Sequence, residues 1–151
     1  MLASGGKKQR EHALWELHGN IWHQGTVYEA TAYAVPFLLE LMRGNHPDAL
    51  DVLGLLALIA DGNSYLKVHG NALKMSDAEY QAQLARELEW VVQAKKAVAM
   101  GTELFMELLA AEDRKLREMG ALLLGLTRSV RSASDDISTI EVIERILGIK
   151  S

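Results

Sequence analysis

The side chains best suited to recognising a ligand lie close together near the start of the chain. They combine aromatic rings with hydrogen-bonding groups and fall within residues 15–28: Trp15, His18, Trp22, His23, Gln24 and Tyr28. Irregular joints on a rigid scaffold often carry binding sites, and aromatic side chains often supply much of the binding energy there. The stretch therefore predicts a binding site. The alternative is that the tryptophans cover an open end of the helical core.

Metal and catalytic chemistry find little support in the sequence. His18 and His23 are not spaced as a zinc-binding pair on a helix, and no acidic third ligand follows at a useful distance. The chain has no cysteine, which excludes thiolate zinc sites, thiol nucleophiles and covalently attached haem or bilin. Glycine-rich phosphate loops and nucleophile elbows are also absent from the sequence. We therefore expect no catalytic residue, no metal site and no cofactor.

Composition places the chain among globular proteins. Its 151 residues suit one domain, and a net charge of −4 argues against general nucleic-acid binding, which needs a basic surface. No apolar run approaches the length of a membrane span or a signal peptide, so we expect no membrane association. With no cysteine to suggest an oxidising compartment, the cytoplasm is the simplest location.

Hydrophobic periodicity predicts an all-α fold of about seven helices. The first covers residues 8–18 and ends at Gly19 and Asn20, a pair that favours a left-handed C-cap. The pattern from Thr26 to Glu29 resembles a capping box and predicts a second helix, continuing to about residue 43 and bent at Pro36. Further helices are expected over residues 47–60, 76–100, 102–111, 113–126 and 139–147, with an extended loop over residues 63–75.

The chain also contains an internal repeat. A shift of roughly 67 residues aligns residues 37–42 with residues 104–109 and keeps the apolar pattern throughout. The two units cover about residues 26–61 and 84–127, with end helices over residues 8–18 and 139–147 in the same domain, 1–151. Two leucine-rich amphipathic helices can also align by chance, which is the alternative interpretation.

The second unit resembles a HEAT repeat. Asp113 at the turn, Arg117 on the following helix and the small residues behind it match that motif, and Pro36 matches its proline. We expect Asp113 and Arg117 to form an i, i+4 ion pair. The first unit departs from the motif, with His46 and Leu50 at the corresponding positions. Residues 14–31 are further similar to bacterial HEAT-like proteins without an assigned function. The resemblance implies a short right-handed α–α superhelix of the armadillo-like class.

Two classes of function follow from this resemblance. The first is a non-enzymatic protein–protein interaction module, which presents a groove between helical hairpins to a protein or peptide. A homodimer through an uncapped face is also compatible with so short a solenoid. The second is an enzyme or ligand-binding protein that uses the joint at Trp22 and His23, in the manner of HEAT-like DNA glycosylases or bilin lyases.

Overall fold

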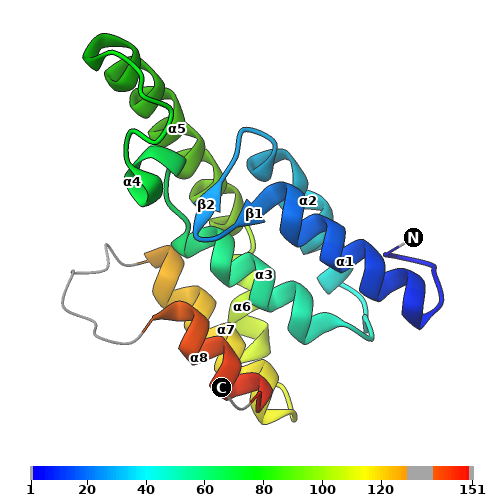
Figure 1. The fold of residues 1–151 in the computed structure, drawn as a ribbon. Helices are drawn as coiled ribbons and strands as arrows, with labels where there is room; N and C mark the ends of the chain where they lie inside the picture. Colours follow the sequence, from blue (N-terminus) through cyan, green and yellow to red (C-terminus); the bar gives the residue numbers. More distant parts are fainter. Residues whose placement is uncertain (1, 129–137, 150–151) are drawn as a thin grey trace.

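The computed structural model describes residues 2–128 and 138–149 and shows a mostly helical protein, as expected for an all-α chain (Figure 1). Within that part there are eight helices and one small hairpin. The helices are α1 (Lys7–Ile21), α2 (Thr31–Met42), α3 (Ala49–Asp61), α4 (Tyr65–His69), α5 (Asp77–Ala99), α6 (Thr102–Leu108), α7 (Arg114–Arg128) and α8 (Thr139–Leu147), and the strands are β1 (Trp22–His23) and β2 (Thr26–Val27). None of the helices in the described ranges is long and apolar enough to cross a membrane.

Helix α3 lies at the centre of the core. Its residues are apolar nearly all round, and those from Val52 to Ala57 are all buried. Such a helix must be covered on several sides, and α3 packs against α2, α5, α7 and α8, with α1 also in contact. The other extensive contacts join α2 to α5 and α6 to α7. Figure 1 shows α7 and α8 on one side of α3 and α1 on the other.

Several element boundaries follow the local sequence signals. Ser76 caps α5, since its hydroxyl accepts from the Glu79 amide while the Glu79 side chain accepts from the Ser76 amide. The break expected at Gly101 separates α5 from α6, and α8 covers the range expected for the last helix, Thr139–Leu147. Strong caps and strong periodicity explain this agreement.

Two expectations about the N-terminal third are wrong. Thr26 does not cap a helix: it lies fully buried in β2, and α2 begins only at Thr31. The Thr31 hydroxyl accepts from the Tyr28 amide and donates to the Ile21 carbonyl, so it holds the end of α1 beside the start of α2. Gly19 does not end α1, because the helix continues to Ile21 and Gly19 keeps a negative φ.

The hairpin between α1 and α2 explains the misplaced cap. Gln24 and Gly25 both have positive φ, 49° and 83°, which is the geometry of a two-residue turn that joins twisted antiparallel strands. Strand β2 also pairs with the chain beyond α3. The Val27 amide donates to the Asn63 carbonyl at 3.0 Å, and the Asn63 amide donates to the Gly25 carbonyl at 2.8 Å. These distant partners keep residues 26 and 27 extended.

Residues 63–75 also differ from the extended loop that was expected, because they contain α4. The Ser64 hydroxyl caps this helix by accepting from the Lys67 amide at 3.1 Å. Helix α4 packs on α5, and the buried Glu87 carboxylate accepts from the Leu66 amide at 2.9 Å. Figure 1 shows α4 and the first half of α5 projecting from the rest of the molecule. We call residues 65–87 the arm.

The expected ion pair between Asp113 and Arg117 is wrong as well. The Asp113 carboxylate instead accepts from the Lys115 amide at 2.8 Å, next to the start of α7. The Arg117 guanidinium donates to the carbonyls of Ala111 and Glu112, at 2.6 and 2.7 Å. Both side chains therefore stabilise the turn between α6 and α7 through backbone groups.

Candidate functional site

A hollow at the end of α1 brings together most of the side chains singled out from the sequence. This aromatic pocket encloses about 410 Å³. Its lining consists of Trp15, Glu16, His18, Gly19, Asn20, Trp22 and His23. Four of the six expected residues therefore share one cavity. Gln24 lies outside it in the hairpin turn. Tyr28 also lies outside the pocket. Burial raises the pKa of its hydroxyl, and Tyr65 adds to that shift.

Gly19 contributes an open stretch to the lining of the pocket. Trp15 and Gly19 lie one turn apart on the same side of α1, and Trp22 directly follows the end of the helix. A Cβ added at Gly19 would meet nothing within 4 Å. The missing side chain therefore leaves the surface of this turn of α1 open beside the pocket.

The aromatic rings of the pocket are held by their neighbours on α1. His12 stacks on Trp15 with 6.1 Å between ring centroids and 13° between the planes, and its Nε2 lies 3.4 Å from the Glu16 carboxylate. His18 meets the Trp22 ring edge to face, with centroids 6.5 Å apart. Both arrangements are favourable geometries for aromatic pairs. The ring orientations therefore depend mostly on contacts within α1 and on the contact between α1 and Trp22, the first residue of β1.

The two tryptophans differ in how far they serve the core. Trp22 is half-buried and packs against the hydrophobic core, and its indole Nε1 is buried without a hydrogen-bond partner in the described part of the chain. Trp15 is 71% exposed. Covering the end of the core is therefore a role for Trp22 alone, and Trp15 presents an aromatic surface to solvent.

The electrostatics of the pocket favour a positive ligand. Burial lowers the pKa of the His18 imidazole, and the nearby Asp51 carboxylate opposes that shift only in part, so burial favours the neutral form of His18. Glu16 is the acidic residue of the lining, which contains no lysine or arginine. Indole faces are also negative. An anion would find no cation here to hold it.

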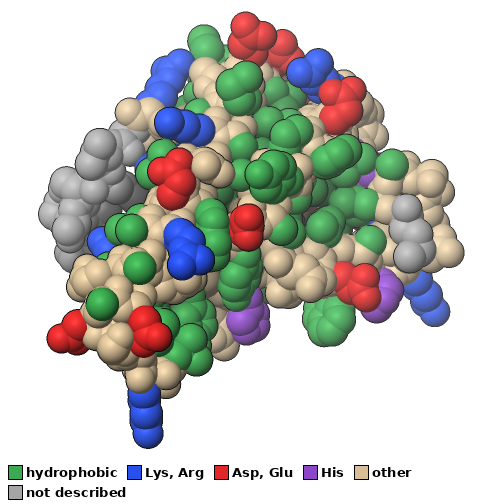
Figure 2. All heavy atoms as spheres, turned by 90° about the horizontal axis from the view of Figure 1, so that it is seen from above, with side chains coloured by type: hydrophobic (Ala, Val, Ile, Leu, Met, Phe, Trp, Pro, Cys, Tyr) green, Lys and Arg blue, Asp and Glu red, His purple; other side chains and the backbone are tan. Residues whose placement is uncertain are grey.

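A second hollow, which we call the apolar groove, lies between the N-terminal segment, α1 and α2. It encloses about 530 Å³ and is lined by Leu2, Ala3, Leu17, Ala34, Phe37, Leu38, Glu40 and Leu41. Phe37 is 74% exposed, and Tyr33, one turn earlier on α2, is 70% exposed. Phe37 belongs to the apolar pattern of residues 37–42, and that pattern alone does not indicate a groove. Figure 2 shows hydrophobic side chains gathered across one face of the molecule.

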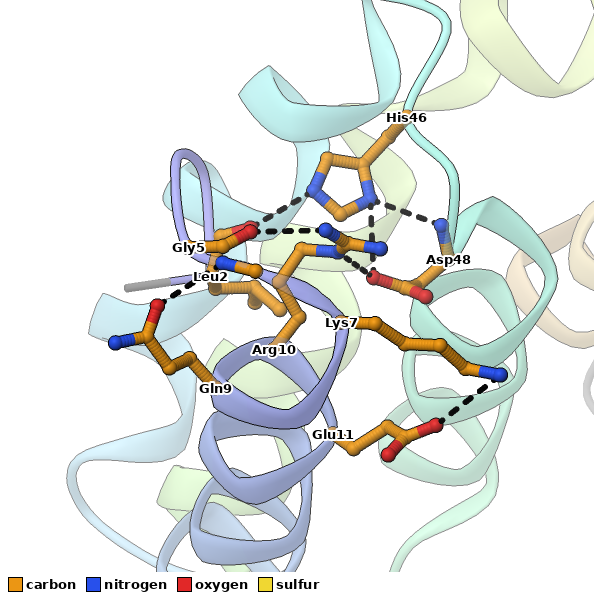
Figure 3. A network of polar contacts seen from close by, with 9 residues as sticks. Leu2, Gly5, Lys7, Gln9, Arg10, Glu11, His46 and Asp48 are labelled. Atoms are coloured by element: carbon orange, nitrogen blue, oxygen red, sulfur yellow. Dashed lines mark hydrogen bonds and ion pairs between the residues drawn. The ribbon is translucent and has the colours of Figure 1, made fainter.

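Polar contacts hold the N-terminal wall of the groove in place (Figure 3). Arg10 donates to the Asp48 carboxylate at 2.6 Å and to the Gly5 carbonyl at 2.8 Å. The Asp48 amide donates to Nδ1 of His46, so Nε2 carries the proton and donates to the Leu2 carbonyl at 3.0 Å. The position of Leu2 therefore depends on residues from α1 and from the turn before α3.

Gly19→Ala is expected to stabilise the protein by about 0.5–1 kcal/mol, because alanine favours the helix and the site has room for a Cβ. Urea denaturation of the variant and the parent protein measures the change. Gly125→Ala is the matched control, since Gly125 lies in α7 with equally open surroundings. A loss of stability at Gly19 alone would contradict a regular helix at that position.

The described residues contain no group of three or more histidine or acidic side chains placed to hold a metal ion. Comparison with known proteins finds no matching family model, no similar curated protein and no similar solved structure. The geometry of the pocket and the groove is therefore the basis for a functional proposal.

Proposed function

We propose that this protein is a non-enzymatic interaction module of the HEAT-like class, and that it binds an apolar segment of a protein partner in the apolar groove. The observation that carries the proposal is the groove itself, in which seven of the eight lining residues are apolar and Phe37 is largely exposed. Large exposed apolar side chains beside a hollow are typical of protein interaction sites.

The helix packing supports the HEAT-like part of this proposal. In a stack of helical hairpins, the first helices of successive units pack together and so do the second helices. Here α3 packs on α7, and α2 packs on α5, the helix that leads into α6 and forms the first half of the second unit's first helical segment. These are the pairs that a short right-handed superhelix built from units 26–61 and 84–127 would make. Helix α8, which packs on α3 and α7, would then be its terminal helix.

The groove's chemistry defines the partner. Burying Phe37 against an apolar partner would contribute about 1.5–3 kcal/mol, so one or two large apolar side chains account for most of the affinity. Glu40 is the charged group of the lining, and Arg43 lies 3.3 Å from it at the surface. We therefore expect a segment with closely spaced apolar residues and polar neighbours, such as one face of an amphipathic helix.

A displayed library of random peptides tests the proposal. Selection on the protein should enrich peptides with apolar residues at helical spacing, and Phe37→Ala should weaken their binding roughly 30-fold, the effect of a 2 kcal/mol hot spot. Leu73→Ala is the control, because Leu73 is also exposed but lies between α4 and α5, outside the groove. Peptides that bind Phe37→Ala as tightly as the parent protein would overturn the proposal.

A further inference from the structure

The aromatic pocket has a geometry that the apolar groove does not share. Trp15 lies on α1, Trp22 directly follows that helix in β1, and both line the same pocket. Gly19 leaves its part of the lining open, and the pocket that both indoles line encloses about 410 Å³. Because both indoles line this one pocket, a compact ligand inside it can contact both.

The charges around the pocket select the class of ligand. Aromatic faces attract cations, and tryptophan does so most strongly. The Glu16 carboxylate adds a negative charge to the lining, and Asp51 lies close enough to His18 to influence it electrostatically. Since neither lysine nor arginine lines the pocket, phosphates and carboxylates are disfavoured.

The hydrogen-bonding groups argue against a sugar. A carbohydrate site needs polar side chains that are free to bind several hydroxyl groups. Here the Asn20 amide nitrogen already donates to the Glu16 carbonyl at 2.8 Å, and the Glu16 carboxylate lies 3.4 Å from His12. Besides the imidazoles of His18 and His23, the pocket offers indole faces and one negative charge, which suit a cation with an apolar shell.

We propose that the aromatic pocket binds a small organic cation of the alkylammonium class between Trp15 and Trp22, with Glu16 as its counter-ion. The contact between Glu16 and His12 is exposed, so exchanging it for a bound ammonium group costs little. This inference does not depend on the apolar groove, because the two sets of lining residues have no member in common.

Calorimetric titration with choline and with its uncharged isostere 3,3-dimethylbutan-1-ol tests the proposal. The two probes have the same shape, so a difference in affinity reports the charge. We expect choline to bind about tenfold more tightly than the alcohol, from cation–π attraction and the Glu16 charge. Glu16→Gln should reduce that preference while leaving the affinity for the alcohol unchanged.

A larger side chain at Gly19 would fill the pocket, and the same substitution at a second open glycine provides a matched control. Gly19→Leu should reduce choline affinity at least tenfold, whereas Gly125→Leu, at an equally open helical position in α7, should bind choline as the parent protein does. Trp15→Ala removes one ring face at a site that is 71% exposed, so the fold is retained, and it too should weaken choline binding. Circular dichroism of each variant verifies folding.

Three results would overturn the inference: no choline binding at millimolar concentration, equal binding of the uncharged alcohol, or unchanged choline binding by both Gly19→Leu and Trp15→Ala. The ammonium group can come from a free metabolite or from a methylated lysine side chain. Titration with a peptide that carries trimethyllysine distinguishes these sources. Tighter binding of the peptide assigns the pocket to protein recognition, and tighter binding of choline assigns it to a free cation.

Discussion

Phe105→Ala is expected to lower the free energy of unfolding by about 3–5 kcal/mol, the usual cost of removing a fully buried aromatic ring. Phe105 is completely buried and lies where α6 approaches α7. A Cβ added at Gly120 would lie 2.9 Å from the Phe105 carbonyl oxygen, and one added at Gly101 would lie 2.7 Å from its ring. Because these segments already pack closely, the surroundings cannot collapse into the cavity. We therefore expect the loss of unfolding free energy to lie near the upper end of this range.

The chain provides its own control for this measurement. It contains two phenylalanines, and the other one, Phe37, is 74% exposed. Chemical denaturation of Phe37→Ala should show a change within about 0.5 kcal/mol of the parent protein. If the two substitutions cost the same, the assignment of Phe105 to the core between α6 and α7 would be wrong.

Asp48→Asn is expected to cost about 1.5–3 kcal/mol, the range for a hydrogen bond to a charged group. The side chains of Arg10 and Asp48 are only 17% and 14% exposed, so water cannot replace the lost carboxylate charge. Arg10 also holds the Gly5 carbonyl, and His46, beside Asp48, holds the Leu2 carbonyl. We therefore expect the substitution to loosen residues 2–6 as well, with faster proteolytic cleavage there.

A neighbouring ion pair on the surface shows what burial contributes. Lys7 and Glu11 lie 3.8 Å apart with side chains 79% and 57% exposed (Figure 3). Glu11→Gln should therefore change the unfolding free energy by less than about 0.5 kcal/mol. A double-mutant cycle with Arg10→Met and Asp48→Asn isolates the energy of the buried pair. A coupling energy near zero would contradict its stabilising role.

The sequence predicted those elements whose signals are local. The cap at Ser76, the break at Gly101 and the final helix all depend on residues within a few positions of the boundary. Thr26 and Glu29 carry the same capping signature as Ser76 and Glu79, but Thr26 lies in a strand. The difference comes from Asn63, which pairs with β2 although α2 and α3 separate the two in the sequence. A local pattern contains no information about such a partner.

The same distinction between local and long-range signals applies to the candidate site. Trp15, His18, Trp22 and His23 share a pocket because they follow one helix and the strand directly after it, so spacing alone brought them together. Periodicity placed Phe37 in an apolar stripe but could not show that no other helix covers it. That depends on how α1, α2 and the N-terminal segment pack, which is a tertiary property.

The arm divides the protein into regions of unequal local stability. Helix α5 passes uninterrupted from the arm into the core, where Ala94 and Val98 are fully buried, whereas within the arm burial is confined to Leu66 and Glu87. Local unfolding begins where few apolar contacts must be broken. Amide hydrogens in the first turns of α5 will therefore exchange with solvent through small openings, and those near Val98 only when the core itself unfolds. A single helix thus belongs to two cooperative units.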